Sequence, residues 1–115
     1  MNNLRKTYLL LMLFYMGLIF YLSSISIPGL IENSNFTKFC LHFFEFSLLG
    51  FLAFKSASNY KLSFLIGTLY GISDEIHQYF VPLRVFDIFD IFADSLGSLI
   101  GSLVAYKLTK QKMIR

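Results

Sequence analysis

The chain has 115 residues, enough for one small domain, and 56% of them are hydrophobic while only 15% are charged. A soluble domain carries roughly 25% charged residues and would expose large apolar patches at this composition, which argues against a water-soluble protein and indicates a membrane protein. The net charge of +3 comes from short basic clusters between apolar runs, a pattern not typical of nucleic-acid binding, and the single cysteine, Cys40, allows no disulfide within the chain.

Four apolar runs predict four transmembrane helices, at residues 7–23, 39–54, 62–80 and 91–108. The first, third and fourth reach the roughly 17–25 residues that cross a bilayer. The second is shorter, but its flanks extend it from Phe36 to Ala57, and we interpret it as a span too. No run alternates polar and apolar residues as a strand would. The predicted fold is all-α, a single domain over residues 1–115 that forms an integral membrane bundle of four helices.

The first run has a second interpretation, as a signal peptide, because Arg5 and Lys6 precede it. It is longer than the usual apolar region of a signal peptide, however, and no A-x-A-like cleavage site follows. The sequence from Ser24 to Pro28 is only a weak substitute for such a site. We therefore predict an uncleaved transmembrane helix.

Basic residues are distributed unevenly between the two predicted sides of the membrane. With a cytoplasmic N-terminus the outer side holds two, Lys38 and Arg84. The inner side holds the other eight: Arg5, Lys6, Lys55, Lys61, Lys107, Lys110, Lys112 and Arg115. Cytoplasmic loops carry the excess of lysine and arginine, so we predict a multi-pass protein of the cell membrane with both termini in the cytoplasm.

The acidic residues and histidines gather on the opposite side. All seven acidic residues and both histidines fall in the predicted outer loops or outer halves of helices. At about 1.5 Å per residue, three helices carry acids roughly 5–9 Å below their outer ends: Glu45, Asp74, Glu75 and Asp94. Charged groups at that depth face the bundle interior or a water-filled cavity. We therefore predict one outward-facing acidic pocket.

Helical spacing places several of these residues on shared faces. His42 and Glu45 are three apart, and Asp74 and Gln78 are four apart. A stripe on the last helix, at 3, 4, 3, 4 spacing, is acidic outside and glycine deeper in: Asp87, Asp90, Asp94, Gly97 and Gly101. The two glycines form a small-xxx-small motif, which predicts close packing against a neighbouring helix.

The segment between the last two helices presents one arginine. Pro82 predicts that the third helix ends at or before Val81. Arg84 then lies just above the acidic level, where its guanidinium can bind a carboxylate or a phosphate through two parallel hydrogen bonds. Asp87 or Asp90 can cap the last helix, and we favour Asp87.

Three further polar residues lie near the predicted outer surface. We expect Glu32 and Lys38 to be solvated. Two interpretations stay open for His77: an interfacial histidine with satisfied hydrogen bonds, or a participant in the acidic cluster.

The sequence from Ser73 to Arg84, followed by Asp90, Asp94 and Gly97-x-x-x-Gly101, resembles the VanZ-like family of small bacterial membrane proteins. The block from His42 to Phe46 is similar to the family's H-x-x-x-Y block, with phenylalanine in place of the tyrosine.

The chain departs from the family pattern at two positions. Phe39 stands where the family often has a lysine, with Lys38 beside it, and Leu83 stands where glycine is common before the arginine. The family is named for a protein that gives low-level resistance to teicoplanin, a glycopeptide that acts on the cell wall from outside. The resemblance therefore implies a role in the cell envelope and an outward-facing site, and it leaves open whether a reaction is catalysed.

The candidate site residues fall into three overlapping sets. The candidate ligand-binding residues are His42, Glu45, Glu75, Gln78, Arg84, Asp90 and Asp94. The candidate catalytic residues are Glu45, Asp74, Glu75, Asp90 and Asp94. The candidate ligands for a divalent metal such as Mg²⁺, Mn²⁺ or Zn²⁺ are His42, Glu45, Asp74, Glu75 and Asp94.

Three function classes compete for this pocket. The first is a non-catalytic envelope or resistance protein that meets a cell-wall or lipid-linked ligand in the bilayer. The second is a membrane enzyme, with or without a metal, acting on a lipid or lipid phosphate that Arg84 would hold. The third is an ion-coupled carrier, for which four short spans are few.

The topology can be tested with reporter fusions. A reporter after Arg115 and a reporter within residues 83–88 are expected on opposite sides of the membrane, the first in the cytoplasm, because of the eight-to-two asymmetry in basic residues. An extracytoplasmic C-terminus would refute the predicted orientation.

Overall fold

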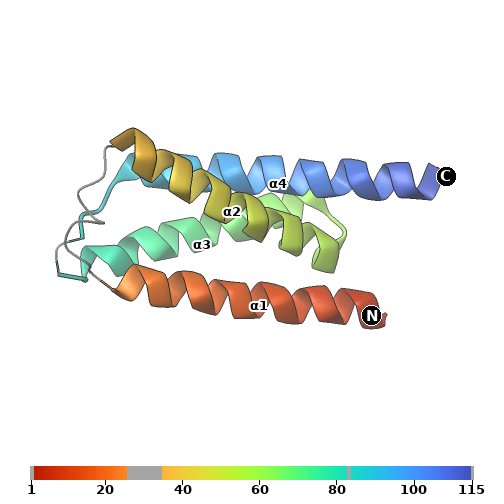
Figure 1. Ribbon diagram of the computed structural model, residues 1–115, viewed down its shortest axis with the longest axis horizontal. Coiled ribbons are helices and arrows are strands. Elements are labelled where there is room, and N and C mark those ends of the chain that lie inside the picture. The colour runs from red at the N-terminus through yellow and green to blue at the C-terminus, as the bar shows by residue number, and fades with distance from the viewer. Residues whose placement is uncertain (1, 26–34, 83, 115) are drawn as a thin grey trace.

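The computed structural model describes residues 2–25, 35–82 and 84–114, and within them the chain forms four α-helices (Figure 1). They are α1 (Asn3–Ser24), α2 (Asn35–Ala57), α3 (Tyr60–Tyr79) and α4 (Ile88–Ile114). The predicted all-α fold is confirmed. Four residues named in the sequence analysis lie outside the described ranges: Pro28 of the weak cleavage-like sequence, Glu32, Leu83 before the arginine, and Arg115.

Side-chain caps explain where two of the helices begin. The Asn59 side chain accepts hydrogen bonds from the backbone N–H groups of Lys61 and Leu62, at 3.0 and 3.1 Å, at the start of α3. The Asp87 side chain accepts the N–H of Phe89 at 2.9 Å, which confirms it as the cap of α4. α3 ends at Tyr79, before Pro82, as the proline predicts.

Helices α1, α2 over Phe36–Ala57 and α4 over Ile88–Gln111 are long and apolar enough to cross a membrane. The extension of the second run to Phe36 and Ala57 is thereby confirmed, and the chain is a multi-pass membrane protein. α3 has 20 residues and lies alongside them, but the polar sequence Ser73–Gln78 in its last turns lowers its hydropathy. Its assignment as a fourth span stays a prediction.

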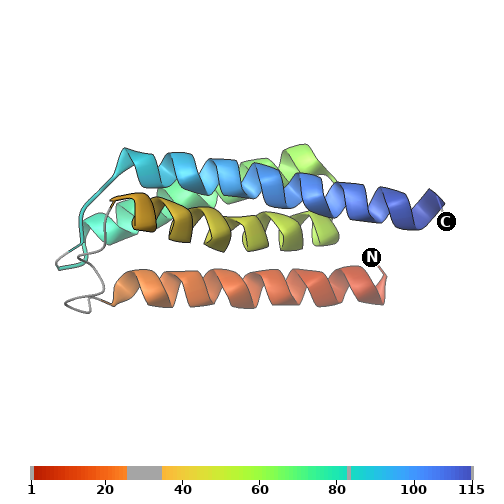
Figure 2. The same ribbon diagram turned by 45° about the horizontal axis from the view of Figure 1, so that its top comes forward.

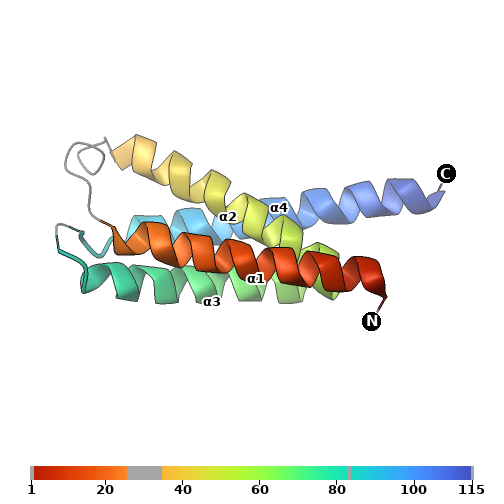
Figure 3. The same ribbon diagram turned by 60° about the horizontal axis from the view of Figure 1, so that its bottom comes forward.

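The four helices run along the 48 Å long axis of the bundle. α4 packs most extensively on α2 and next on α3. α1 lies against α2 and α3 and, over the described residues, does not touch α4 (Figures 2 and 3). The start of α1 and the end of α4 lie at one end of the bundle, while the end of α1, the start of α2, the end of α3 and the start of α4 lie at the other (Figure 1).

The apolar core lies where α2 meets α1. Phe46, Leu49 and Ala53 of α2 are fully buried against Ile19 and Met12 of α1. Most large apolar side chains face outward instead, for example Phe14 at 75% exposure. An exposed apolar surface of this kind fits contact with lipid, in agreement with the composition.

Glycines bring the backbones of α2 and α4 into contact. A β-carbon built on Gly97 would collide with the carbonyl oxygen of Phe43, and one on Gly101 would collide with the carbonyl oxygen of Ser47. Gly50 of α2 is equally tight against the carbonyl oxygen of Ser98. The close packing predicted from the small-xxx-small motif is therefore confirmed, and α2 is the partner helix.

This contact predicts that Gly101→Ala lowers stability. The added methyl group meets a backbone atom that cannot move without separating the helices, and such overpacking costs about 1–3 kcal/mol. Thermal unfolding in detergent would measure the loss. Gly17→Ala is the matched control, because among the described residues no atom beyond the adjoining backbone of α1 lies within 4 Å of a β-carbon there. Equal melting temperatures for the two variants would contradict the tight contact.

Candidate functional site

Polar side chains from all four helices meet in the half of the bundle away from the chain ends. Six of them that the sequence singles out are buried: His42, Asp74, Glu75, Gln78, Asp90 and Asp94. Three helices supply them: α2 brings the histidine, α3 brings three residues and α4 brings two. At the depth predicted from the helix rise, the polar side chains of α2, α3 and α4 therefore come together in the interior of the bundle.

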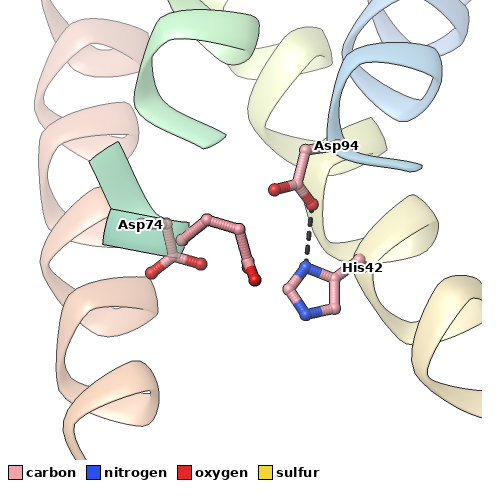
Figure 4. Close-up of side chains that lie close together, drawn as sticks. His42, Asp74 and Asp94 are labelled. Carbon is pink, nitrogen blue, oxygen red and sulfur yellow. Dashed lines mark hydrogen bonds and ion pairs between the residues drawn. The ribbon is translucent and has the colours of Figure 1, made fainter. Parts of the chain in front are cut away.

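His42 joins α2 to α4. Its Nδ1 lies 2.8 Å from Asp94 Oδ1, and its Nε2 lies 3.6 Å from Asp90 Oδ2 (Figure 4). Asp94 is fully buried, and among the described residues its second oxygen, Oδ2, has no hydrogen-bond partner. Gly71 of α3 makes room for this carboxylate, since a β-carbon there would lie 2.8 Å from Asp94 Oδ2.

Lys38 joins the contact between α2 and α4, so the prediction that it is solvated is wrong. Its Nζ lies 3.3 Å from Asp90 Oδ2 and 3.8 Å from Asp87 Oδ2, and its side chain is 28% exposed. Lys38 stands one turn before His42 on the same face of α2, so both meet the acidic stripe of α4. That four-residue spacing was the signal available in the sequence.

Glu75 connects α3 to the start of α4. Its Oε1 accepts the backbone N–H of Asp87 at 2.9 Å. The side chain is fully buried, and within the described part of the chain Oε2 has no hydrogen-bond partner. One oxygen of Glu75 is therefore structural, and the other is left for a different partner.

Asp74, the neighbour of Glu75, faces α1. The Ser23 hydroxyl donates a short hydrogen bond to Asp74 Oδ1, and Gln78 Nε2 donates to Asp74 Oδ2 at 3.3 Å. Gln78 Nε2 also donates to Ser23 Oγ at 3.3 Å. Ser23 was missed in the sequence because a serine at the end of an apolar run is common, and no spacing links it to α3.

Four residues converge closely enough to share one ligand. His42, Asp74, Glu75 and Asp94 each offer one ligand atom, and these four atoms lie within 4.8 Å of one another. Figure 4 shows the side chains of His42, Asp74 and Asp94 around one space. A histidine nitrogen and three carboxylate oxygens are a donor set able to hold a divalent metal.

Glu45 lies outside that group, although the sequence predicted it at nearly the same depth as Asp74, Glu75 and Asp94. It is one turn further along α2 than His42 and is only half-buried. Its backbone carbonyl accepts a hydrogen bond from the Tyr15 hydroxyl at 2.8 Å, which ties this turn of α2 to α1.

Arg84 and His77 both face α1. The guanidinium of Arg84 is half-buried and donates to the Ile25 carbonyl at 3.0 Å. Among the described residues, no ion pair joins Arg84 to a carboxylate. His77 stacks on Phe20 at 4.2 Å between ring centroids, and its Nε2 lies 3.2 Å from Ser24 Oγ. Among the described residues its buried Nδ1 has no hydrogen-bond partner, so both interpretations of His77 stay predictions.

Comparison with protein-family models finds a match to the VanZ/LLP1 family over residues 8–110. The match covers most of the chain, so the chain belongs to this family, as the resemblance over the central motifs suggested. Comparisons with curated proteins and with solved structures found no similar chain.

The ion pair between Lys38 and Asp90 predicts a double-mutant result. Lys38→Met should lower the free energy of unfolding by about 1–3 kcal/mol, because it leaves a buried carboxylate without its nearest cation. Adding Asp90→Asn should recover part of that loss. The control is Lys61→Met, at an exposed lysine near the other end of the bundle. Equal unfolding of the two lysine variants in detergent would show that the pair contributes nothing.

Proposed function

We propose that this member of the VanZ/LLP1 family is a cell-envelope protein whose polar pocket faces outward and lowers susceptibility to teicoplanin-type glycopeptides or maintains the envelope. The observation that carries the proposal is the position of the buried histidine and carboxylates. They lie in the half of the bundle opposite both chain ends.

The charge distribution supports this orientation. The basic residues at the end of the bundle that holds both termini include Arg5, Lys55, Lys61 and Lys107. By the positive-inside rule this end belongs in the cytoplasm, with both termini. The pocket would then face the side on which a glycopeptide antibiotic meets the cell wall.

The polar cluster combines acidic groups with one arginine, Arg84, in the segment between α3 and α4. We assign ligand binding to His42, Glu45, Glu75, Gln78, Arg84, Asp90 and Asp94. A guanidinium has five N–H donors, and the bond to Ile25 uses one of them. Since Arg84 forms no ion pair with the described carboxylates, a clamp for an anionic group of a cell-wall or lipid-linked ligand is favoured over an electrostatic lock.

A membrane enzyme acting on a lipid or lipid phosphate is the second candidate. The four converging ligand atoms favour it, because a bound metal polarises a phosphoryl oxygen or activates water. Its catalytic residues would come from Glu45, Asp74, Glu75, Asp90 and Asp94. An ion-coupled carrier has less support, since the six acidic residues that the structure describes lie toward one end and offer no relay across the described part of the bundle.

The clamp predicts a specific result in a susceptible host that the intact chain protects. Arg84→Ala should abolish protection against teicoplanin while membrane abundance and melting temperature stay at the wild-type level. Arg84→Lys should rescue poorly, because lysine lacks the planar fork that binds an anion through two hydrogen bonds. Susceptibility, abundance and thermal stability are measured together.

Lys61→Gln, at the other end of the bundle, is the control and should protect like the wild type. Full protection by Arg84→Ala at normal abundance would remove Arg84 from the site. If expression of the intact chain changes susceptibility in no host, the resistance role itself is wrong.

A further inference from the structure

We propose that His42, Asp74, Glu75 and Asp94 bind one divalent cation of the Mn²⁺ or Zn²⁺ class. The inference deepens the proposed function, because the cation would be bound in the same pocket. It rests on the proposed function only in taking this pocket as the functional site. Its geometric basis is the set of four buried ligand atoms within 4.8 Å of one another, contributed by α2, α3 and α4.

Two carboxylate oxygens at this point lack a partner. Glu75 and Asp94 are both 0% exposed, so water does not reach their side chains. Among the described residues, Glu75 Oε2 and Asp94 Oδ2 have no hydrogen-bond partner either. A buried polar atom left unsatisfied is unfavourable, and more so when it carries charge. A cation between them satisfies both oxygens at once, which a purely structural cluster would not require.

The charges also leave an excess to be balanced. Four carboxylates lie together, namely Asp74, Glu75, Asp90 and Asp94, and the described cationic groups in contact with them are Lys38 and His42. Lys38 sits at the outer edge, against Asp90 and Asp87. Among the described residues the inner carboxylates have His42 as their one directly contacting cationic group, and a divalent ion would supply further positive charge.

The donor set and its size select the class of cation. Imidazole suits Zn²⁺ and related transition metals and carboxylates suit Mn²⁺, whereas Ca²⁺ and Mg²⁺ prefer oxygen ligands throughout. Two ligand atoms bound at about 2.1 Å lie at most about 4.2 Å apart. The widest pair in the group, at 4.8 Å or less, therefore closes by up to about 0.6 Å if its atoms lie on opposite sides of the ion, and by up to about 1.4 Å at the tetrahedral separation of about 3.4 Å.

The surroundings of His42 match those of a metal-binding histidine. Such a histidine usually donates its second ring N–H to a carboxylate, which fixes the ring. Nδ1 lies 2.8 Å from Asp94 Oδ1, within hydrogen-bond distance, and Nε2 faces Asp90 Oδ2 at 3.6 Å, which is an ion-pair distance and too long for a hydrogen bond. We assign Nδ1 to the cation, and Nε2 must then move closer to Asp90 to donate its proton to it. Any proton shared by Nδ1 and Asp94 is released to solvent when the metal binds. Asp90, held by Lys38, is then a positioning residue.

Metal content of the purified full-length chain tests the proposal. The protein in detergent is stripped with a chelator, reloaded separately with Mn²⁺, Zn²⁺ or Mg²⁺, desalted and subjected to elemental analysis. One retained Mn²⁺ or Zn²⁺ per chain is expected, with a melting temperature several degrees higher than that of the stripped protein. Retention of none, or of Mg²⁺ alone, would overturn the proposal.

Matched variants locate the site. His42→Asn and Asp94→Asn should lose both the retained metal and the metal-dependent rise in melting temperature. His77→Asn should keep both, because His77 stacks on Phe20 and is not one of the four converging ligand residues. Glu75→Gln replaces Asp94→Asn if the latter fails to fold. Undiminished retention in the folded cluster variants, or equal loss in His77→Asn, would refute the assignment.

The readouts separate this inference from the proposed function. A chain that binds the metal stoichiometrically but never alters glycopeptide susceptibility would remove the resistance role and leave the metal site standing. A chain that protects cells yet retains no Mn²⁺ or Zn²⁺ would refute the metal site and leave the resistance role standing.

Discussion

The backbone contact between α2 and α4 determines where every group at the site lies. Gly97 packs on the carbonyl of Phe43, the residue after His42, so the register of the two helices is fixed at the site itself. This register puts His42 opposite Asp94 and Lys38 opposite Asp90. A hydrogen bond tolerates only a few tenths of an ångström, so a side chain at the glycine positions would separate the pairs as well as the backbones.

α3 completes the site because two consecutive residues point to different neighbours. Residues next to each other on a helix lie about 100° apart around its axis. Asp74 therefore meets Ser23 of α1, while Glu75 meets the backbone N–H of Asp87 before α4. Asp74 and Glu75 thereby link α1 to α4, which do not touch each other over the described residues. The two acids also contribute two of the four converging ligand atoms.

Sequence reasoning predicted the level of the site and the close contact through Gly97 and Gly101, because both follow from helix rise and side-chain size. It did not predict which residues share a centre. Depth along a helix says nothing of helix crossing, and His42 and Glu45 differ by about 4.5 Å along the axis, so only His42 joins the group.

The role of Lys38 was missed for a different reason. A lysine near a helix start is usually solvated, and its partner, Asp90, lies 52 positions later in the chain, since 90 − 38 = 52. The pairing depends on the register of α2 and α4, which the sequence does not state. Ser23 is a similar case, because its contact with Asp74 requires the placement of α1 against α3.

The distribution of satisfied and unsatisfied groups separates the scaffold from the site. Asp74 has hydrogen-bond partners that hold helices together. Asp90 Oδ2 has no hydrogen bond among the described residues but has Lys38 as an ion-pair partner, so each of these two residues could serve packing alone. Glu75 and Asp94 instead have one structural oxygen and one oxygen that no described residue meets. A bundle selected only for stability would replace such carboxylates with apolar side chains, since sequences break local rules chiefly at functional sites. The two unpartnered oxygens are therefore the strongest indication that this pocket holds a ligand.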